Sequence, residues 1–444
     1  MLRNRRVKSP VGLPCRTADQ LESDDALIDR LHRGAFTYFL RYVNPLNGLV
    51  ADTSRPGAPS SIAVVGFALT SYIVGVERGW LPRRAAVERT LVTLRFFLSG
   101  EQSGRPGALG YKGFYFHFLD MHSGTRVWRS ELSLIDSTLL LAGVLSVAVY
   151  FDQPGEREIP ELAAVLYERV DWHWAQNDAL SLWQGWLPEF GFLHYGWEGY
   201  NEALILYILG LGADAHALAP STFAKWTVTY QWERILGQDV LYSGPLFTHL
   251  FSHAWIDFRG IRDAFMREKR SDYFENSRRT VALQREYCER NPHQCVGYGR
   301  DLWGISAGDG PGGEGTREFA ADRRRFGYMA RGIPFGPDDG TLCPWAMLAT
   351  LPVTPQAALA GTRQLLSRFP QVCSEDRFVS GFNPSVNSET GGWVSAGWYG
   401  LDQGLLVLMI ENARSGLIWS LLRESKIVRQ GLRRAGFRGG WLGR

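Results

Sequence analysis

The sequence is poor in cysteine, in long apolar runs and in net charge, and each shortage excludes a class of protein. The five cysteines among 444 residues include no CxxC pair. An odd number of scattered cysteines argues against a disulfide framework and against a zinc site. No stretch reaches the roughly 18 apolar residues of a membrane span, and no apolar segment follows the basic N-terminal residues as it would in a signal peptide. We therefore expect free thiols in a soluble chain with no membrane span and no export signal.

The charge of the chain gives no sign of a nucleic-acid partner. The formal net charge is only +3, from 48 basic and 45 acidic residues. The basic side chains gather at the two ends, in Met1–Lys8 and Arg429–Arg444, whereas nucleic-acid binding needs a broad basic surface. We expect these ends to be solvated and no nucleic acid to bind.

Aromatic residues are abundant, with 16 Trp, 17 Tyr and 24 Phe. Plain core packing accounts for about two thirds of them. The remainder could stack on sugars, because flat apolar rings fit the C–H faces of sugar rings.

Apolar periodicity and capping residues predict about twelve helices. They lie at 24–42, 60–78, 83–99, 130–150, 156–170, 201–211, 220–236, 249–268, 272–290, 341–350, 354–368 and 401–412. A further helix at 415–426 is expected to dock the C-terminal end against the others.

The lengths of the connections alternate along the chain. The links after the first, third and every further odd helix run from about 12 to about 50 residues, and those after the even helices run from roughly three to eight. In an antiparallel array of helices, alternate connections emerge at opposite ends, so all long loops gather on one face, where function is expected. The sequence thus predicts an all-α fold, an (α/α)6 toroid in a single domain. The predicted boundaries are a flexible segment 1–23, a catalytic barrel 24–426 and a basic tail 427–444.

Two acidic residues stand at the start of the helix predicted at 130–150. Ser130 is a candidate N-cap, which places Glu131 in the first turn and Asp136 below it. At about 100° per residue the two carboxylates cannot share one face. Either one faces a cavity, or one caps the helix and the other is satisfied in the core.

Glu202 stands where a long loop enters the apolar helix predicted at 201–211. The helix dipole favours the ionised carboxylate, whereas desolvation beside Trp186, Trp197 and Tyr200 raises its pKa. If burial dominates, Glu202 is a general acid; if the dipole dominates, it is a base. Helix capping is the alternative, but it would not require the surrounding aromatic rings.

The remaining long loops carry further polar and aromatic residues. His249 and His253 are four residues apart and could share a face with Asp257. No glutamate follows the first histidine and no third ligand cluster is present, so hydrogen bonding is favoured over a metal site. The glycine-rich segment 308–313 lacks the Lys-Ser/Thr of a phosphate loop and is interpreted as part of a lid that includes Trp303.

Together these residues predict an acidic, aromatic cleft at the starts of the inner helices, and such a cleft suits glycosidic cleavage by two carboxyl groups. The candidate catalytic residues are Glu202, Glu131, Asp136 and Asp402. The candidate substrate-binding residues are Arg129, Trp186, Trp197, Glu198, Tyr200, Asn201, His249, His253, Trp303, Asp309 and Trp393. We expect no cofactor and no metal.

Several sequence strings, in order along the chain from about Ala26 to Phe437, resemble one known family. They are Gly75–Gly79, Phe116–Met121, Ser130–Ser133, Ile135–Asp136, Gly199–Ala203, Trp255–Gly260, Tyr273–Ser277 and Ile410–Asn412. The family is the bacterial glucoamylase-like domain, which includes β-1,2-glucanases and the cyclisation region of cyclic β-1,2-glucan synthases.

The resemblance implies an (α/α)6 barrel that acts on β-1,2-linked glucose polymers without a cofactor. It also implies that Glu131 and Glu202 are the essential acids and that the protein is periplasmic. We expect a β-glucan substrate as the partner and a monomeric protein. The sequence departs from the family pattern at Leu180–Trp186 and at Gly308, where a cysteine often stands. Hydrolysis of β-1,2-glucan, transfer of chains on the same glucan, and binding without catalysis all stay open.

Overall fold

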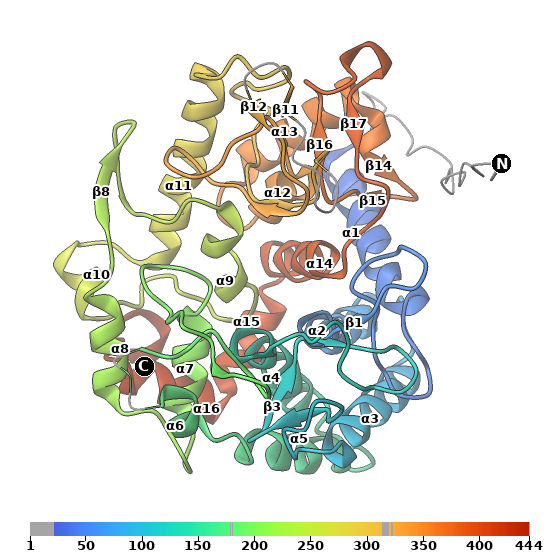
Figure 1. Ribbon diagram of the computed structural model, residues 1–444, viewed down its shortest axis with the longest axis vertical. Helices are drawn as coiled ribbons and strands as arrows, with labels where there is room; N and C mark the ends of the chain where they lie inside the picture. The colour runs from blue at the N-terminus through green and yellow to red at the C-terminus, as the bar shows by residue number, and fades with distance from the viewer. Residues whose placement is uncertain (1–21, 178, 180, 313–318, 321–322, 444) are drawn as a thin grey trace.

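The computed structural model describes residues 22–443, except 178, 180, 313–318 and 321–322. Within these residues, six helices surround the centre of the molecule and others cover them from outside (Figure 1). The inner helices are α2 (Ile62–Glu77), α4 (Leu134–Tyr150), α7 (Leu204–Gly212), α9 (Phe251–Trp255), α12 (Pro344–Ala349) and α14 (Gly400–Arg414). The helices outside them are α1 (Asp24–Arg41), α3 (Arg83–Ser99), α5 (Glu158–Glu168), α8 (Pro220–Thr227), α11 (Tyr273–Arg290) and α13 (Pro355–Arg368). The predicted segment 1–23 lies almost wholly outside the described residues.

Each outer helix packs on an inner partner. Helix α1 packs on α14, α3 on α2, α5 on α4, and α13 on α12. On α8, Trp226 stacks on Tyr207 of α7 with ring centroids 4.4 Å apart. Helix α11 packs on the 3-10 turn η1 (Leu246–His249) that leads into α9. This pairing places a second helical layer around the first.

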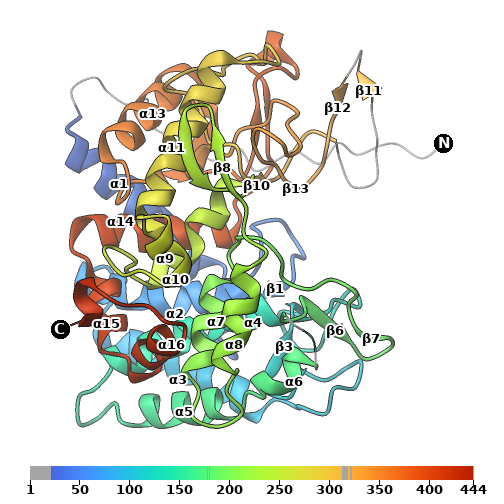
Figure 2. The same ribbon diagram turned by 90° about the vertical axis from the view of Figure 1, so that its left-hand side faces the viewer.

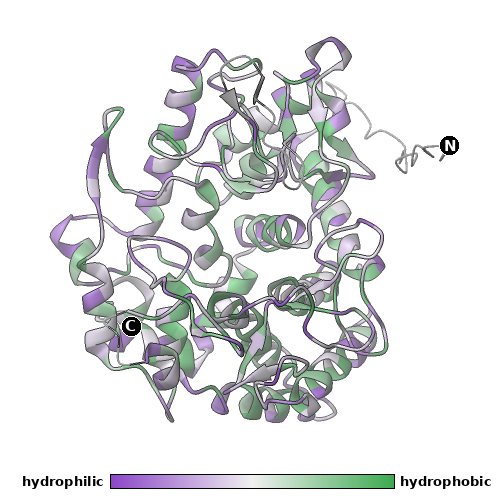
Figure 3. Ribbon diagram, in the orientation of Figure 1, coloured by the Kyte–Doolittle hydropathy of each residue, from purple (hydrophilic) through white to green (hydrophobic). Residues whose placement is uncertain are grey.

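The sequence explains which helices are inside. Every residue of α7 is buried, as are Ile62–Gly75 of α2 and Leu134–Val147 of α4. These segments are predominantly apolar on all sides, which suits a helix covered along most of its surface. Polar residues gather on peripheral helices such as α11 (Figure 3).

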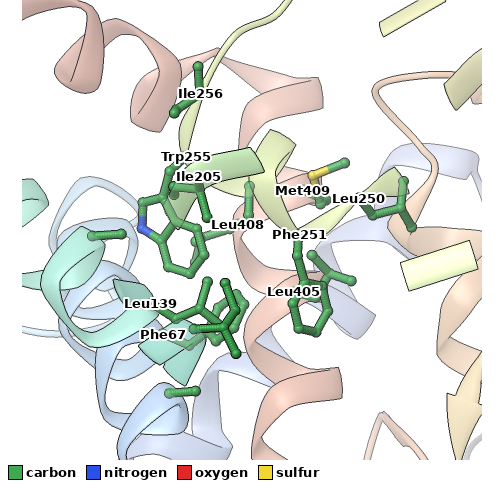
Figure 4. Close-up of a cluster of buried hydrophobic side chains, with 14 of the residues drawn as sticks. Phe67, Leu139, Ile205, Leu250, Phe251, Trp255, Ile256, Leu405, Leu408 and Met409 are labelled. Carbon is green, nitrogen blue, oxygen red and sulfur yellow. The ribbon is translucent and has the colours of Figure 1, made fainter. Parts of the chain in front are cut away.

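The inner helices share one hydrophobic core (Figure 4). On α9, Phe251 and Trp255 contact Phe67 of α2, with ring centroids 5.8 Å and 4.6 Å apart. The Trp255 indole N–H donates to Thr70 at 3.0 Å, which satisfies its buried polar atom. The same cluster includes Leu139, Ile205, Leu250, Ile256, Leu405, Leu408 and Met409.

The expectation of an all-α fold is wrong, because the long loops contain sheets. The largest sheet is antiparallel, with strands in the order β2 (Gly110–Tyr111), β3 (Phe114–Phe116), β5 (Leu132–Ser133), β6 (Gly185–Leu187) and β7 (Gly191–Phe192). Strands of two to four residues are too short to show the alternation that reveals a strand in sequence. The chain is therefore mostly helical with added sheet.

The other strands form two-stranded antiparallel pairs. These are β1 (Ser60–Ser61) with β4 (Phe118–Leu119), β8 (Trp232–Ile235) with β9 (Gln238–Leu241), β10 (Ala307–Gly308) with β13 (Met329–Ala330), β11 (Phe319–Ala320) with β12 (Arg323–Arg324), β14 (Cys373–Ser374) with β15 (Arg377–Phe378), and β16 (Phe382–Asn383) with β17 (Trp393–Val394). In Figure 2, β3, β6, β7, β10 and β13 lie on the same side of the helical body.

Two predicted helices are interrupted. The helix predicted at 220–236 ends at Thr227, and β8 and β9 follow as a hairpin whose turn residues Leu236 and Gly237 both have positive φ, 47° and 81°. A two-residue turn of this kind matches the twist of paired strands.

The helix predicted at 249–268 is replaced by α9, an extended segment and the short helix α10 (Ala264–Glu268). Gly260 has φ 72°, and Asp263 caps α10 by accepting from the Met266 amide at 2.7 Å.

The start of α4 also differs from the prediction. Ser133, not Ser130, is its N-cap and accepts from the Asp136 amide at 3.2 Å. The preceding residues Leu132–Ser133 pair with β3 and β6, so Glu131 lies before the helix.

Short helices complete the fold. They are α6 (Trp172–Gln176), α15 (Leu417–Glu424), α16 (Lys426–Arg434), η2 (Pro370–Val372), η3 (Ser388–Thr390) and η4 (Gly440–Gly443). Residues 427–434, expected within a basic tail, belong to α16, which packs on α7 through its buried residues Val428 and Leu432. The amphipathic spacing of these two apolar residues accounts for the difference. Among the described residues no single helix is long and apolar enough to cross a membrane, although the bent pair α14 and α15 would be by length and composition.

Candidate active site

A cavity of about 540 Å³ opens where the N-terminal ends of the six inner helices meet. Its wall includes a residue at or just before the start of each one: Pro59 (α2), Asp136 (α4), Glu202 (α7), Phe251 (α9), Trp345 (α12) and Asp402 (α14). The alternation of loop lengths predicted this convergence, and the structure confirms it.

Glu202 lies two residues before the start of α7, at the cavity wall. Its backbone is fixed from α9, because the Ser252 hydroxyl donates to the Glu202 carbonyl at 3.1 Å and accepts from the Ile205 amide at 3.1 Å. Burial raises the pKa of Glu202 to about 7, and the nearby Asp136 carboxylate adds to this effect. Of the two outcomes that the sequence left open, burial therefore dominates over the favourable helix end, and the carboxyl group is half-protonated near neutral pH.

His117 stands between two of the predicted acids. Its Nδ1 donates to Glu131 Oε1 at 2.8 Å, and its Nε2 is 3.5 Å from Asp136 Oδ2. Burial lowers the pKa of His117, but the carboxylates of Asp136, Glu131 and Asp52 outweigh this and raise the pKa to about 9. The imidazole is thus a cation at neutral pH, set among acids.

The acids around His117 respond to that charge. Burial opposes ionisation of Glu131, but the hydrogen bond from His117 holds the pKa of Glu131 below its usual value. Burial raises the pKa of Asp52 to about 6, against the opposing charges of His117 and Arg55. The Asp136 carboxyl also accepts from the Ser133 hydroxyl at 2.5 Å.

The donor atoms of His117, Glu131 and Asp136 all lie within 4.8 Å of one another and are a possible metal-binding set among the described residues. Metal binding requires a neutral imidazole. A pKa of about 9 for His117 means that a metal would have to displace a proton at neutral pH. The protonated histidine already supplies the positive charge between the carboxylates.

Asp402 lies in the first turn of α14, on another side of the cavity from Glu202. Helix α14 contacts α2 and α9, whereas α7 is joined to them through α4 and Ser252. Burial raises the pKa of Asp402 well above its usual range, and its Oδ2 atom has no hydrogen-bond partner within the described residues. An unpartnered buried oxygen at a cavity wall is available to a bound polar group.

The loops around the cavity add aromatic rings and one ion pair. Tyr328 stacks on Tyr399 with centroids 5.7 Å apart, and Tyr328 is 54% exposed. Arg55 pairs with Asp309 and lies over the Tyr399 ring at 5.6 Å. Asp309 also accepts from the Ser395 hydroxyl at 2.8 Å. Aromatic faces beside polar groups are what a sugar ring requires.

The structure brings together only part of the predicted site. Of the candidate acids, Glu202, Asp136 and Asp402 line the cavity, and Glu131 lies behind His117. None of the predicted substrate-binding residues is on the cavity wall, although Asp309 holds Arg55, which is. Arg129 follows Trp128, which does line the cavity, but Arg129 itself is exposed.

The tryptophans predicted as sugar platforms lie elsewhere. Trp303 is fully buried and Trp197 is 8% exposed. Trp393 belongs to β17, and Trp186 stacks on Tyr111 with centroids 5.2 Å apart. Burial gives Trp303 and Trp197 structural roles, and Tyr111 covers one face of Trp186.

The other predicted contacts also serve the fold. Tyr200 stacks on Tyr273, with centroids 5.5 Å apart. The Asn201 side chain donates to the Glu198 carbonyl at 3.1 Å, and Glu198 is exposed.

His249 and His253 are buried within the fold. Burial lowers the pKa of His249 to about 4 and that of His253 to about 3, so both are neutral. His249 Nε2 lies 3.1 Å from the Ser243 carbonyl, and His253 Nε2 lies 3.1 Å from the Ser277 hydroxyl.

Sequence reasoning missed several residues on the cavity wall. They are Asp52, Arg55, His117, Phe118, Trp128, Tyr328, Trp345 and Tyr399. Apart from Trp345, which lies on α12, each is a polar or aromatic residue in a long connection on the predicted functional face. Loop residues carry no periodicity that would say which of them turn inward.

The chain is similar to known proteins both in sequence and in structure. Residues 194–426 match the glycoamylase family model, described as "Putative glucoamylase". The chain is 26% identical over 450 residues to the exo β-1,2-glucooligosaccharide sophorohydrolase (non-reducing end) of Parabacteroides distasonis, with 93% of this chain covered. The chain spans 58% of the length of that relative.

Solved structures share the fold. A crystal structure of a "putative glucoamylase" from Bacteroides uniformis is 27% identical with a TM-score of 0.84, covering 96% of this chain and 100% of that one. The endo-β-1,2-glucanase of Chitinophaga pinensis, in complex with sophorotriose and glucose, is 24% identical with a TM-score of 0.82, covering 95% of this chain and 100% of that one. The family model matches more than half of the sequence, and the chain therefore belongs to the glycoamylase family.

Proposed function

We propose that this chain hydrolyses β-1,2-linked glucan, with Glu202 as the general acid. The observation that carries the proposal is a carboxyl group of pKa about 7 on the wall of an aromatic cavity that also holds other acids. A general acid is most effective when its pKa lies near the working pH. The Parabacteroides distasonis relative is named for acting on β-1,2-glucooligosaccharides, and the Chitinophaga pinensis structure is described with sophorotriose, which supports the linkage.

The second carboxylate has two candidates on the cavity wall. The Asp136 Oδ2 atom accepts from Ser133 and lies 3.5 Å from His117 Nε2, so this oxygen already has partners. The Asp402 carboxyl has a free Oδ2 and lies away from Glu202 around the ring of helices. Activation of water needs an oxygen that can accept a proton from it, and so we assign this role to Asp402.

The assigned roles define the reaction. Glu202 donates its proton to the glycosidic oxygen as the bond to the anomeric carbon breaks, and a water deprotonated at Asp402 attacks that carbon. Burial raises the pKa of Asp402 well above its usual range, so bound sugar hydroxyls and water have to favour its ionised form for it to act as a base. The Asp136 carboxylate raises the pKa of Glu202 further and so helps to keep this acid protonated.

Product analysis on linear β-1,2-glucan tests the function. Hydrolysis yields sophoro-oligosaccharides with one new reducing end for each bond broken. Altered chain lengths without new reducing ends would show that the protein transfers glucan chains and does not hydrolyse them. Unchanged substrate would show that it binds glucan without catalysis. A β-1,3-glucan serves as the control for linkage.

The assignment of the second carboxylate has its own test. Asp402→Asn should lose activity by about 10²–10⁴-fold, and added azide should restore turnover of an activated aryl sophoroside by replacing the water. Rescue of Asp136→Asn in place of Asp402→Asn would move the role to Asp136.

A further inference from the structure

A second hollow lies next to the active-site cavity. It has a volume of about 590 Å³, which is within the usual range for a ligand site. Both hollows share one wall: Thr53, Arg55, Pro56, Gly57, Ala58, Pro59 and Trp128 line each of them. We call the second hollow the distal cleft and the shared segment 53–59 the dividing loop.

The distal cleft offers aromatic faces together with polar groups. Trp128 is 71% exposed, and Tyr42 is half-buried. Arg41, Asp120 and His122 contribute charged and polar groups to the lining. Exposed aromatic rings flanked by hydrogen-bonding groups suit a sugar chain.

The positive charges of the cleft are already balanced, which argues for a neutral ligand. Arg41 pairs with Glu375 at 2.7 Å, and Arg55 pairs with Asp309. An anionic ligand would have to compete with these carboxylates. A neutral polyhydroxyl chain can bind beside them without breaking either pair.

The walls of the cleft are held in place before any ligand arrives. Asn44 and Asn47 both donate to the Met121 carbonyl, at 2.7 Å and 3.0 Å, and so join the two loops that form its sides. In the dividing loop, the Ser54 amide donates to the Trp398 carbonyl at 2.9 Å, and the Ser54 hydroxyl accepts from the Trp398 amide at 3.0 Å. A preformed site loses less entropy on binding.

We infer that the distal cleft binds glucose units of the same glucan chain beyond those held in the active-site cavity. This inference rests on the proposed function, since it names how that substrate continues past the dividing loop. The shared wall makes the two hollows neighbours, and the balanced charge and aromatic lining select a neutral sugar chain. Long chains should therefore bind better than short ones.

Substitution of Tyr42 tests the inference through chain length. Tyr42→Ala removes an aromatic face, and kcat/KM on linear β-1,2-glucan should fall about 3- to 10-fold, mainly through KM. On sophorotriose, a short chain that the inference places in the active-site cavity alone, kcat/KM should stay within about twofold of wild type. Tyr42→Phe keeps the ring and should behave as wild type on both substrates.

Leu46→Ala is the matched control, because Leu46 is 88% exposed in the same loop and does not line the cleft. Equal loss on short and long substrates in Tyr42→Ala, or no loss on either, would overturn the inference while leaving the proposed function intact. If Tyr42→Ala melts well below wild type, then His122→Ala, an exposed cleft residue, replaces it under the same criteria.

Failure of the proposed function gives a different result. The wild-type protein would then cleave neither substrate. Calorimetric titration with the same glucan still tests whether the distal cleft binds glucan in that case. Tyr42→Ala should weaken the binding of long chains, and Leu46→Ala should not. Equal affinity in the two variants would reject the cleft as a glucan site.

Discussion

Replacement of Glu202 by glutamine removes the proposed acid with little change in shape. Catalysis by a general acid contributes about 10²–10⁴-fold, so kcat on β-1,2-glucan should fall by that factor. The loss should nearly vanish on an aryl sophoroside with a good leaving group, because such a leaving group departs without a proton. Glu198→Gln is the control, since Glu198 is an exposed glutamate in the same loop and lies off the cavity wall.

The pH dependence of the same variant follows from the raised pKa. Glu202 must be protonated to act, so kcat/KM of the wild type should decline as pH rises above about 7. That decline should be absent from the residual activity of Glu202→Gln. Reducing-end release measured from pH 5 to about pH 9 would show both profiles.

The raised pKa of Glu202 also predicts a pH-dependent change in the free energy of unfolding. The pKa of Glu202 is raised from 4.5 to about 7, and at about 1.4 kcal/mol per unit the ionised form destabilises the fold by up to about 3 kcal/mol. Because the folded pKa is the higher one, this loss is absent below pH 4.5, grows as pH rises through about 7 and is complete above it. Glu202→Gln should therefore gain stability relative to wild type between pH 4 and about pH 8, measured by urea unfolding.

Near-normal activity of folded Glu202→Gln on β-1,2-glucan would refute the acid role. A stability difference that does not change with pH would refute the physical account, because the carboxyl would then not be titrating in a buried position.

Three further predictions concern other residues. Glu131→Gln removes the carboxylate that lies 2.8 Å from His117, so the pKa of His117 should fall from about 9 and kcat/KM should drop about 10-fold. NMR titration of His117 and steady-state rates test this prediction, and an unchanged pKa of His117 would contradict it. Trp303→Ala should lower the free energy of unfolding by about 3–5 kcal/mol with KM unchanged, because Trp303 is fully buried; a higher KM with normal stability would restore its role as a sugar contact. Asp339→Asn leaves the buried Arg331 guanidinium without its carboxylate and should lower the free energy of unfolding by about 3–5 kcal/mol, measured with denaturant. A change under 1 kcal/mol would show that the carbonyl oxygens of Gly308, Phe326 and Gly327 are enough to stabilise the guanidinium.

The helical frame could be predicted because its signals are local. Helix α14 has an apolar stretch and α11 an amphipathic one, and each reads as a helix from its own residues. The alternation of loop lengths also fixes which helix ends share a face, since consecutive antiparallel helices leave no other choice. Glu202 and Asp402 follow from the same rule, because both stand at the starts of inner helices.

The sheets, and the contacts of His117 with Glu131 and Asp136, could not be predicted in this way. Strands β5 and β6 are formed by hydrogen bonds between segments about 50 residues apart in sequence, and each is too short to signal itself. The extended segment after α9 likewise depends on Asp257, which is buried against Arg259 and Arg423.

By itself, the sequence determined the helices, the face on which the long loops gather and the two carboxyl groups that open α7 and α14. Only the tertiary structure decided that His117 stands between Glu131 and Asp136, and that Trp303 is in the core and not at the cavity. The physical reason is that helices are stabilised by contacts within a few residues, whereas the charge and exposure of a loop side chain are set by neighbours distant in sequence.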